Sequence, residues 1–284
     1  SELQKREITF LHMGSDRFPQ SLFKLSEPPR WIFVQGNPDC LSANAIVAVV
    51  GTRNPTSLGL TLASQCAGEL VKRNAVVLSG LAKGIDEQAH QGAVSYFGQS
   101  IAVLGYGVLA KDTPHDTELA EKIVQFDGAI ISEYLPYDIP SRTGFLRRNE
   151  LQASLSNLVI PVECPSLESG TGATIRRAMK IGTPVAGITP ENETNDSLQA
   201  TKNNLELLQR SIFKVRSDNS KDFWDFLRKV MPEHDWTINL QPSQQRFFRD
   251  IVKNIIHARS SLSIDEKAID RLAEELKEAI RKEK

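Results

Sequence analysis

Three short glycine-containing turns carry the residues best able to bind an anion. Gly51-Thr52-Arg53 and Ser79-Gly80-Leu81-Ala82-Lys83-Gly84 each combine small residues with a cation, and Ser169-Gly170-Thr171 precedes an expected helix. Backbone N–H groups at a helix start, together with a nearby arginine or lysine, form an anion site. These turns therefore predict a phosphate-binding site, although a plain tight turn or helix cap would need the same glycines.

A second group of cations surrounds an aromatic residue further along the chain. Arg142, Arg147, Arg148 and Asn149 lie close to Phe145. Arginine holds phosphate and an aromatic ring can stack a base, so this composition suits a single-stranded nucleic acid. The alternative is that Phe145 belongs to the core and the arginines are solvated.

A possible catalytic pair also occurs. Asp86 and His90 are four residues apart and would share one face of a helix. No nucleophile is evident beside them, so a structural hydrogen bond is favoured and no catalytic residue is assigned.

Short apolar strands must position these turns. Ile46–Val50 is an unbroken apolar run, as expected of a strand buried on both faces of a parallel sheet. Helical patterns separate most of the strands, and this βαβ alternation predicts an α/β fold with a doubly wound, mostly parallel sheet whose ligands bind at the carboxyl ends of the strands. The expected strands are 46–50, 76–78, 101–104, 129–131, 158–162 and 184–188.

The pattern divides the chain into three parts. Residues 1–44 lack glycine-turn chemistry and are expected to form an N-terminal cap, with a strand-like WIFV before Gly36. Residues 45–215 form the nucleotide- or DNA-binding domain. Residues 216–284 are expected to be a small helical region, with helices at 222–230, at 243–257 and after the capping box Ser263–Glu266.

Composition excludes several classes. The 284 residues carry a formal net charge of −1, so a nucleic-acid site must be a local basic patch. The three cysteines form no CxxC, and no apolar stretch is long enough to span a membrane, which favours a cytoplasmic protein. There is no GxGxxG after the first strand, no GxxxxGK[ST] and no HExxH, so no cofactor and no metal are expected.

At these residues the chain resembles the DprA/Smf family of DNA-processing proteins. The resemblance implies an extended Rossmann-like domain, a homodimer, non-enzymatic binding of single-stranded DNA, and loading of a RecA-type recombinase during natural transformation. Carried over residue by residue, it implies that phosphate contacts involve Gly51, Thr52, Arg53, Ser79, Gly80, Lys83, Gly84, Arg147, Arg148, Asn149, Ser169, Gly170 and Thr171. The matching marks are residues 18–37, 47–56, 78–90, 101–107, 131–134, 145–156, 162–178 and 203–204.

The chain also departs from the family pattern. Glu150 stands where the family usually has arginine, Lys83 replaces an arginine, and the C-terminal region lacks the pattern of a winged helix. Two alternatives stay open. A phosphoribohydrolase of the same superfamily would need an acid where Ile175 and Arg176 stand, and a nucleotide sensor would use the helical C-terminal region to signal a small ligand.

Overall fold

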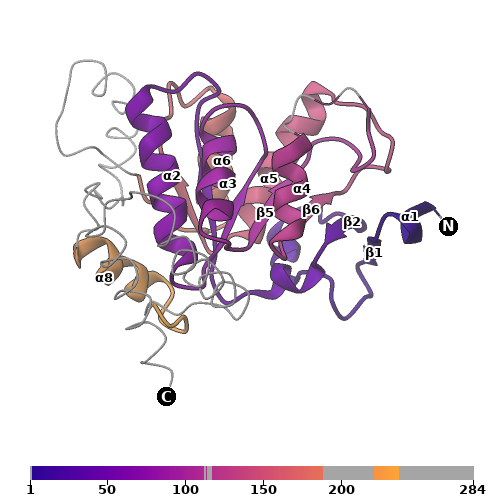
Figure 1. Ribbon diagram of the computed structural model, residues 1–284, viewed down its shortest axis with the longest axis horizontal. Coiled ribbons are helices and arrows are strands. Elements are labelled where there is room, and N and C mark those ends of the chain that lie inside the picture. The colour runs from indigo at the N-terminus through magenta and orange to yellow at the C-terminus, as the bar shows by residue number, and fades with distance from the viewer. Residues whose placement is uncertain (1, 112, 114–116, 188–220, 237–284) are drawn as a thin grey trace, which may run out of the picture.

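A mixed sheet in the order β1-β2-β6-β5-β4-β3-β7 forms the centre of the computed structural model, which describes residues 2–111, 113, 117–187 and 221–236 (Figure 1). The strands are β1 Ile8–His12, β2 Trp31–Gly36, β3 Ile46–Val50, β4 Val76–Ser79, β5 Ser100–Val103, β6 Ala129–Ser132 and β7 Leu158–Pro161. The helices are α1 Glu2–Lys5, α2 Ser57–Val71, α3 Ile85–Ser95, α4 Thr117–Gln125, α5 Arg142–Leu155, α6 Gly170–Lys180 and α8 Lys221–Val230, with 3₁₀ turns η1 Gln20–Lys24 and η2 Pro38–Ser42.

The five strands from β6 to β7 run parallel, and every residue of β3 is buried. The α/β, Rossmann-like fold class is thus confirmed. One expected strand differs: at 184–188 the described residues form a single parallel bridge, between Val159 and Val185, instead of a named strand. Gly182, with φ at +77°, and Pro184 precede that bridge and leave little regular backbone for pairing.

The N-terminal residues add two strands to the sheet, and the segments beside these strands pack in the apolar cluster on one of its faces. β2 pairs antiparallel with β6, and β1 pairs antiparallel with β2. The strand-like WIFV is therefore β2, whereas the sequence pattern gave no strand at β1. Because both pairings are antiparallel, the end of β1 and the start of β2 lie at the carboxyl edge of the parallel strands.

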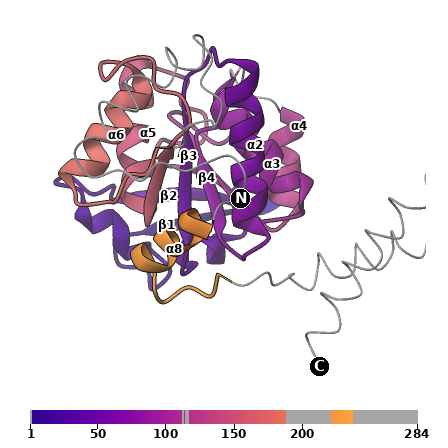
Figure 2. The same cartoon turned by 90° about the vertical axis from the view of Figure 1, so that its left-hand side faces the viewer.

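Helices cover both faces of the sheet. In Figure 2, α2, α3 and α4 lie on one side of β3 and β4, and α5 and α6 lie on the other. The close packing of α2 on α3 depends on Gly92, where a side-chain carbon would meet the backbone of Ser64 at 2.4 Å. Two main apolar clusters result, one on each face.

Helix α8 closes the amino end of the sheet, beneath α2 (Figure 1). Leu227, Met231 and Trp236 join the core formed by α2 and α3, and His234 Nε2 lies 2.7 Å from the carbonyl oxygen of Arg73. α8 covers the helix expected at 222–230, while those expected at 243–257 and after 263 lie outside the described residues. Within the described ranges, no helix has the length and apolar character needed to cross a bilayer.

Chain order creates a crevice at the carboxyl ends. From β3 the chain builds β4, β5 and β6 on one side, then returns to place β7 on the other side of β3. Such a switch point is where doubly wound sheets bind their ligands.

Candidate phosphate-binding site

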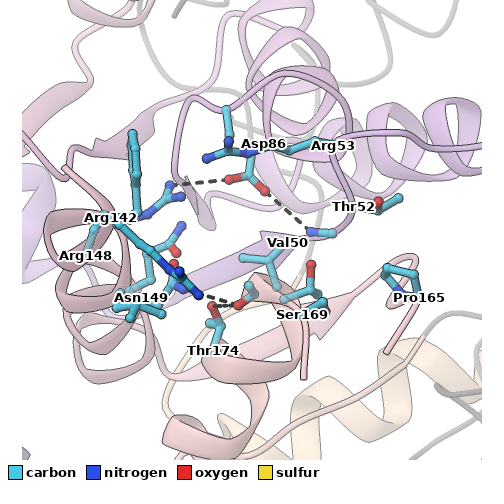
Figure 3. A pocket seen from close by; sticks show the side chains of 17 residues that line it. Val50, Thr52, Arg53, Asp86, Arg142, Arg148, Asn149, Pro165, Ser169 and Thr174 are labelled. Atoms are coloured by element: carbon cyan, nitrogen blue, oxygen red, sulfur yellow. Dashed lines mark hydrogen bonds and ion pairs between the residues drawn. The ribbon is translucent and has the colours of Figure 1, made fainter. Parts of the chain in front are cut away.

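A cavity of about 330 Å³ occupies the switch point between β3 and β7 (Figure 3). Its walls come from the turn after β3, the start of α3, one face of α5 and the start of α6. The lining residues are Val50, Gly51, Thr52, Arg53, Ala82, Asp86, Arg142, Phe145, Leu146, Arg148, Asn149, Gln152, Pro165, Ser169, Gly170, Thr171 and Thr174.

Hydrogen bonds join the three turns into one unit. The N–H of Thr52 donates to the carbonyl oxygen of Glu163 (3.0 Å), and the N–H of Ile85 donates to the carbonyl oxygen of Thr52 (3.2 Å). Gly84, with φ at +94°, permits this approach, because a side-chain carbon there would lie 2.6 Å from the Thr52 oxygen. The turn after β3 is therefore held on both sides.

Arg53 leaves that turn and lies over an aromatic ring. Its guanidinium carbon is 5.2 Å from the ring centroid of Phe145, within the range of a cation–π contact. Phe145 in turn packs edge-on against Tyr106, with ring centroids 6.1 Å apart. Phe145 thus positions Arg53, and one face of its ring is covered by the guanidinium.

Arg148 and Asp86 form a buried ion pair beside the cavity. Nη1 of Arg148 is 3.4 Å from Asp86 Oδ2, and Asp86 Oδ1 accepts the N–H of Gly51 at 3.4 Å; the dashed lines from Asp86 in Figure 3 mark these contacts. Burial raises the pKa of Asp86, and the charge of Arg148 opposes that rise. The guanidinium requires a glycine at position 80, where any side chain would collide with it.

Two nitrogen donors of the cavity wall have no partner within the described structure. They are Nε of Arg148 and Nε2 of Gln152, from residues that are only 6% and 1% exposed. Both residues line the cavity and lie one turn apart on α5. Buried donors are rarely left unsatisfied, so a bound water or a ligand atom is needed to complete the hydrogen bonding of this wall.

The start of α6 faces the same space. Ser169 caps the helix by accepting the N–H of Gly172 (3.1 Å), and Asn149 Nδ2 donates to the carbonyl oxygen of Gly170 (3.2 Å). These bonds fix the first turn of an eleven-residue helix whose positive end points into the cavity.

All four predicted residues of the second turn lie away from the cavity lining: Ser79, Gly80, Lys83 and Gly84. The Ser79 hydroxyl donates to the carbonyl oxygen of Val49 (2.7 Å), Gly80 and Gly84 provide space, and Lys83 is exposed to solvent. The second turn therefore supports the wall instead of lining it.

Arg147 lies on a different side of α5 from Arg148. Its Nε donates to Glu133 (2.8 Å), its Nη1 to Glu150 (2.7 Å), and Glu150 also pairs with Arg177 (2.7 Å). The acid that departs from the family pattern thus bridges arginines of α5 and α6 and does not line the cavity.

Sequence reasoning did not single out Gln152 or Thr174 for this site. Gln152 could have been found by treating the residues after Ser141 as a helix and asking which of them share one face. Phe145, Arg148, Asn149 and Gln152 follow the i, i+3, i+4, i+7 spacing of one helix face, whereas Arg147 falls outside that series.

His90 performs a structural task. The N–H of Leu81 donates to Nε2 of His90 (3.3 Å), and Nδ1 lies 2.7 Å from the Ser100 hydroxyl oxygen. Complete burial lowers the pKa of His90 to about 3, so the ring is neutral. Neither ring nitrogen of His90 is bonded to Asp86, and among the described residues no group of His, Cys, Asp and Glu is arranged to hold a metal.

Comparisons with known proteins agree with this geometry. Residues 9–218 match the family model of DNA recombination-mediator protein A. The chain is 32% identical to protein Smf of Synechocystis over 221 residues, covering 77% of this chain and 54% of that protein, and 28% identical to DNA processing protein DprA of Bacillus subtilis, covering 65% and 62%. It thus spans little more than half the length of these curated relatives.

Solved structures give the same result. DprA from Streptococcus pneumoniae superposes with a TM-score of 0.64 at 29% identity, covering 75% of this chain and 74% of that one. DprA from Helicobacter pylori, whose structure was described for its single-stranded DNA binding mode, superposes with a TM-score of 0.64 at 26% identity, covering 80% and 97%. Since the family model spans most of its length, this chain belongs to the DNA recombination-mediator protein A family, the DprA/Smf proteins.

Proposed function

We propose that this chain binds single-stranded DNA at the β3–β7 cavity and acts without chemistry as a mediator of recombination. Arg53 and Arg142 would contact phosphates at the mouth, and the start of α6 would receive a phosphate oxygen. The charge of Arg148 is already balanced by Asp86, so its contribution would be a directed N–H donor.

The observation that carries this proposal is the pair of unsatisfied donors, Arg148 Nε and Gln152 Nε2. They stand in the same cavity as two further arginines and a helix N-terminus. The two N–H donors can bind a hydrogen-bond acceptor, and the arginines and the helix N-terminus attract negative charge. A nucleic-acid backbone supplies both. The single-stranded DNA binding described for the H. pylori relative supports the same ligand class.

A binding role fits the acidic groups better than hydrolysis. Among the lining residues Asp86 is the one acid, and it is engaged by Arg148 and Gly51. Ile175, which stands where a phosphoribohydrolase would place its acid, is fully buried in an apolar cluster. Hydrolysis of a glycosidic bond ordinarily requires two carboxylates, so a single engaged acid favours binding.

The family assignment extends the proposal to partners. A recombination mediator would hand its DNA to a RecA-type recombinase, and the chain would act as a homodimer in the cytoplasm. These steps follow from the family's role and rest on the same DNA-binding cavity.

The test is fluorescence anisotropy with labelled oligo-dT and with duplex DNA at two salt concentrations. We expect tighter binding to the single strand, with log K falling by about 0.7 per neutralised phosphate for each unit of log salt. Arg53→Ala and Arg142→Ala should each weaken binding. Arg17→Ala is the matched control, because Arg17 pairs with Asp39 at the opposite edge of the sheet.

Two further arms separate the alternatives. Binding of a labelled mononucleotide that unlabelled oligo-dT does not displace would replace DNA with a small nucleotide as the ligand. Release of free base from nucleoside monophosphates, lost in Asp86→Asn, would replace binding with catalysis. Absence of oligonucleotide binding at low salt would overturn the proposal.

A further inference from the structure

A second cavity, of about 600 Å³, opens on the same edge of the sheet as the first. The end of β1, the turn before β2, the residue after β6 and the outer side of α5 form it. Its lining residues are Met13, Glu27, Pro28, Pro29, Arg30, Trp31, Glu133 and Arg147.

Trp31 is the largest apolar group of this cavity, and its orientation is fixed. The indole Nε1–H donates to the carbonyl oxygen of Glu133 at 3.0 Å, yet 37% of the residue remains exposed. A hydrogen bond at one end of the indole and an accessible ring surface together give an oriented aromatic platform. Such a platform binds a planar partner at low entropic cost.

The two cavities flank one helix. Leu146 lines the first and Arg147, the next residue of α5, lines the second. Their separation is therefore on the order of one helix diameter, about 10–12 Å. The loop that joins β6 to α5 exposes the apolar side chains of Leu135, Tyr137 and Ile139, and Ile139 is 77% exposed.

Charge distinguishes the second cavity from the first. Arg147 is paired with Glu133 and Glu150, and the exposed Arg30 is accompanied by the exposed Glu27. The two arginines and two glutamates of the lining thus cancel in charge, which favours a nucleobase over a phosphate.

We propose that the second cavity is a base-binding subsite for the same single strand, with one base stacked on Trp31. This inference rests on the proposed function, because the first cavity must hold the backbone. A strand passing over the start of α5 would place phosphates near Arg53 and Arg142 and a base on the indole ring. Base–aromatic stacking contributes substantially to affinity and tolerates any sequence.

Oligonucleotide length separates the two subsites. Oligo-dT of about two nucleotides, at about 3.4 Å per stacked nucleotide, is too short to reach across one helix and should occupy the first cavity alone, whereas oligo-dT of about sixteen should span both. Trp31→Leu should weaken binding of the long oligonucleotide by about 5- to 100-fold and leave the short one unchanged. Trp31→Phe, which keeps an aromatic ring, should retain most of the affinity.

Fluorescence gives an independent readout. The long oligonucleotide should quench tryptophan emission in the wild type, and Trp31→Phe should abolish that quenching, because Trp236 is buried and Trp224 belongs to α8, at the opposite edge of the sheet. Tyr96→Leu is the matched control, an exposed aromatic at the opposite edge of the sheet. It should bind both oligonucleotides as the wild type does.

The outcomes are distinguishable. If Trp31→Leu binds the long oligonucleotide with wild-type affinity, the subsite is wrong, the proposed function stands, and this surface is left for a protein partner. If the wild type binds neither oligonucleotide, the proposed function fails and the subsite fails with it.

Discussion

The guanidinium of Arg148 fills the space beside Gly80. A side-chain carbon built on Gly80 would lie 1.1 Å from Nη1 of Arg148 and 2.7 Å from Oδ2 of Asp86. The glycine of the second turn is therefore the condition for the buried ion pair, although it contacts no ligand itself.

Gly80→Ala should break this pair. Displacing Arg148 leaves Asp86 buried without its partner, so we expect the free energy of unfolding to fall by about 3–5 kcal/mol. Oligonucleotide affinity should also fall. Urea unfolding and anisotropy measure the two effects. Gly170→Ala is the stability control, since a side chain there meets nothing within 4 Å. A stable Gly80→Ala protein with wild-type affinity would contradict the expectation.

Phe145→Leu should weaken DNA binding without removing a cation. The leucine cannot hold the guanidinium of Arg53, so the arginine would sample other rotamers. We expect a loss of about 0.5–1 kcal/mol in binding free energy. A double-mutant cycle with Arg53→Ala measures the coupling, and additive effects would show that the ring does not act through Arg53.

Glu150→Arg restores the usual residue of the family and should still be harmful. It removes the acceptor of Arg147 and Arg177 and places a third cation between them. We expect the free energy of unfolding to drop by about 1.5–3 kcal/mol. Affinity for oligo-dT at physiological salt should change little, because Glu150 does not line the cavity. A large gain in affinity would show that the acid restrains DNA binding.

His90 should make stability depend on pH. Its pKa in the folded protein is about 3, against an ordinary value of 6.5. As the pH falls below 6.5, His90 becomes protonated in the unfolded chain and stays neutral in the folded chain. Stability should therefore decrease by about 1.4 kcal/mol per pH unit towards acid. Urea unfolding at several pH values should show a smaller slope in His90→Gln, and equal slopes would refute this origin.

Leu227→Ala should lower stability while sparing DNA binding. Leu227 is fully buried in the core beneath α2, at the edge of the sheet opposite the cavity. We expect a loss of about 2–5 kcal/mol in the free energy of unfolding. Lys229→Ala, an exposed residue of the same helix, is the control. Loss of oligonucleotide affinity in a folded Leu227→Ala protein would reveal communication between the two edges.

Unbroken apolar runs predicted the parallel strands well, because a strand buried on both faces tolerates few other residues. β3 is such an unbroken apolar run, and all of its residues are buried. β1 lacks such a run, since this antiparallel edge strand mixes the buried residues Ile8 and Leu11 with the exposed residues Phe10 and His12. Its partners in β2 lie between 19 positions (His12 to Trp31) and 27 positions (Ile8 to Gln35) further along the chain, and short-range pattern carries no information on those contacts.

The location of the candidate site could be predicted from the sequence, but not every residue that lines it. Arg147 and Arg148 are identical in type and adjacent in sequence, yet one joins a carboxylate network and the other a buried pair. Only the packing of α5 against β3 decides between them. Gln152 carries no charge or motif, and its relevance emerges from burial without a partner.

The bonds from Thr52 to Glu163 and from Ile85 to Thr52 have a consequence for the energetics of the whole edge. These two bonds link three segments that are distant in the chain, so the turn at Thr52 cannot open without breaking both. Amide hydrogen exchange at Thr52 and Ile85 should therefore be slow and equal in rate, reporting one cooperative unit. A ligand would meet an edge that is already ordered, and the conformational entropy of arranging it is lost during folding, before any DNA arrives.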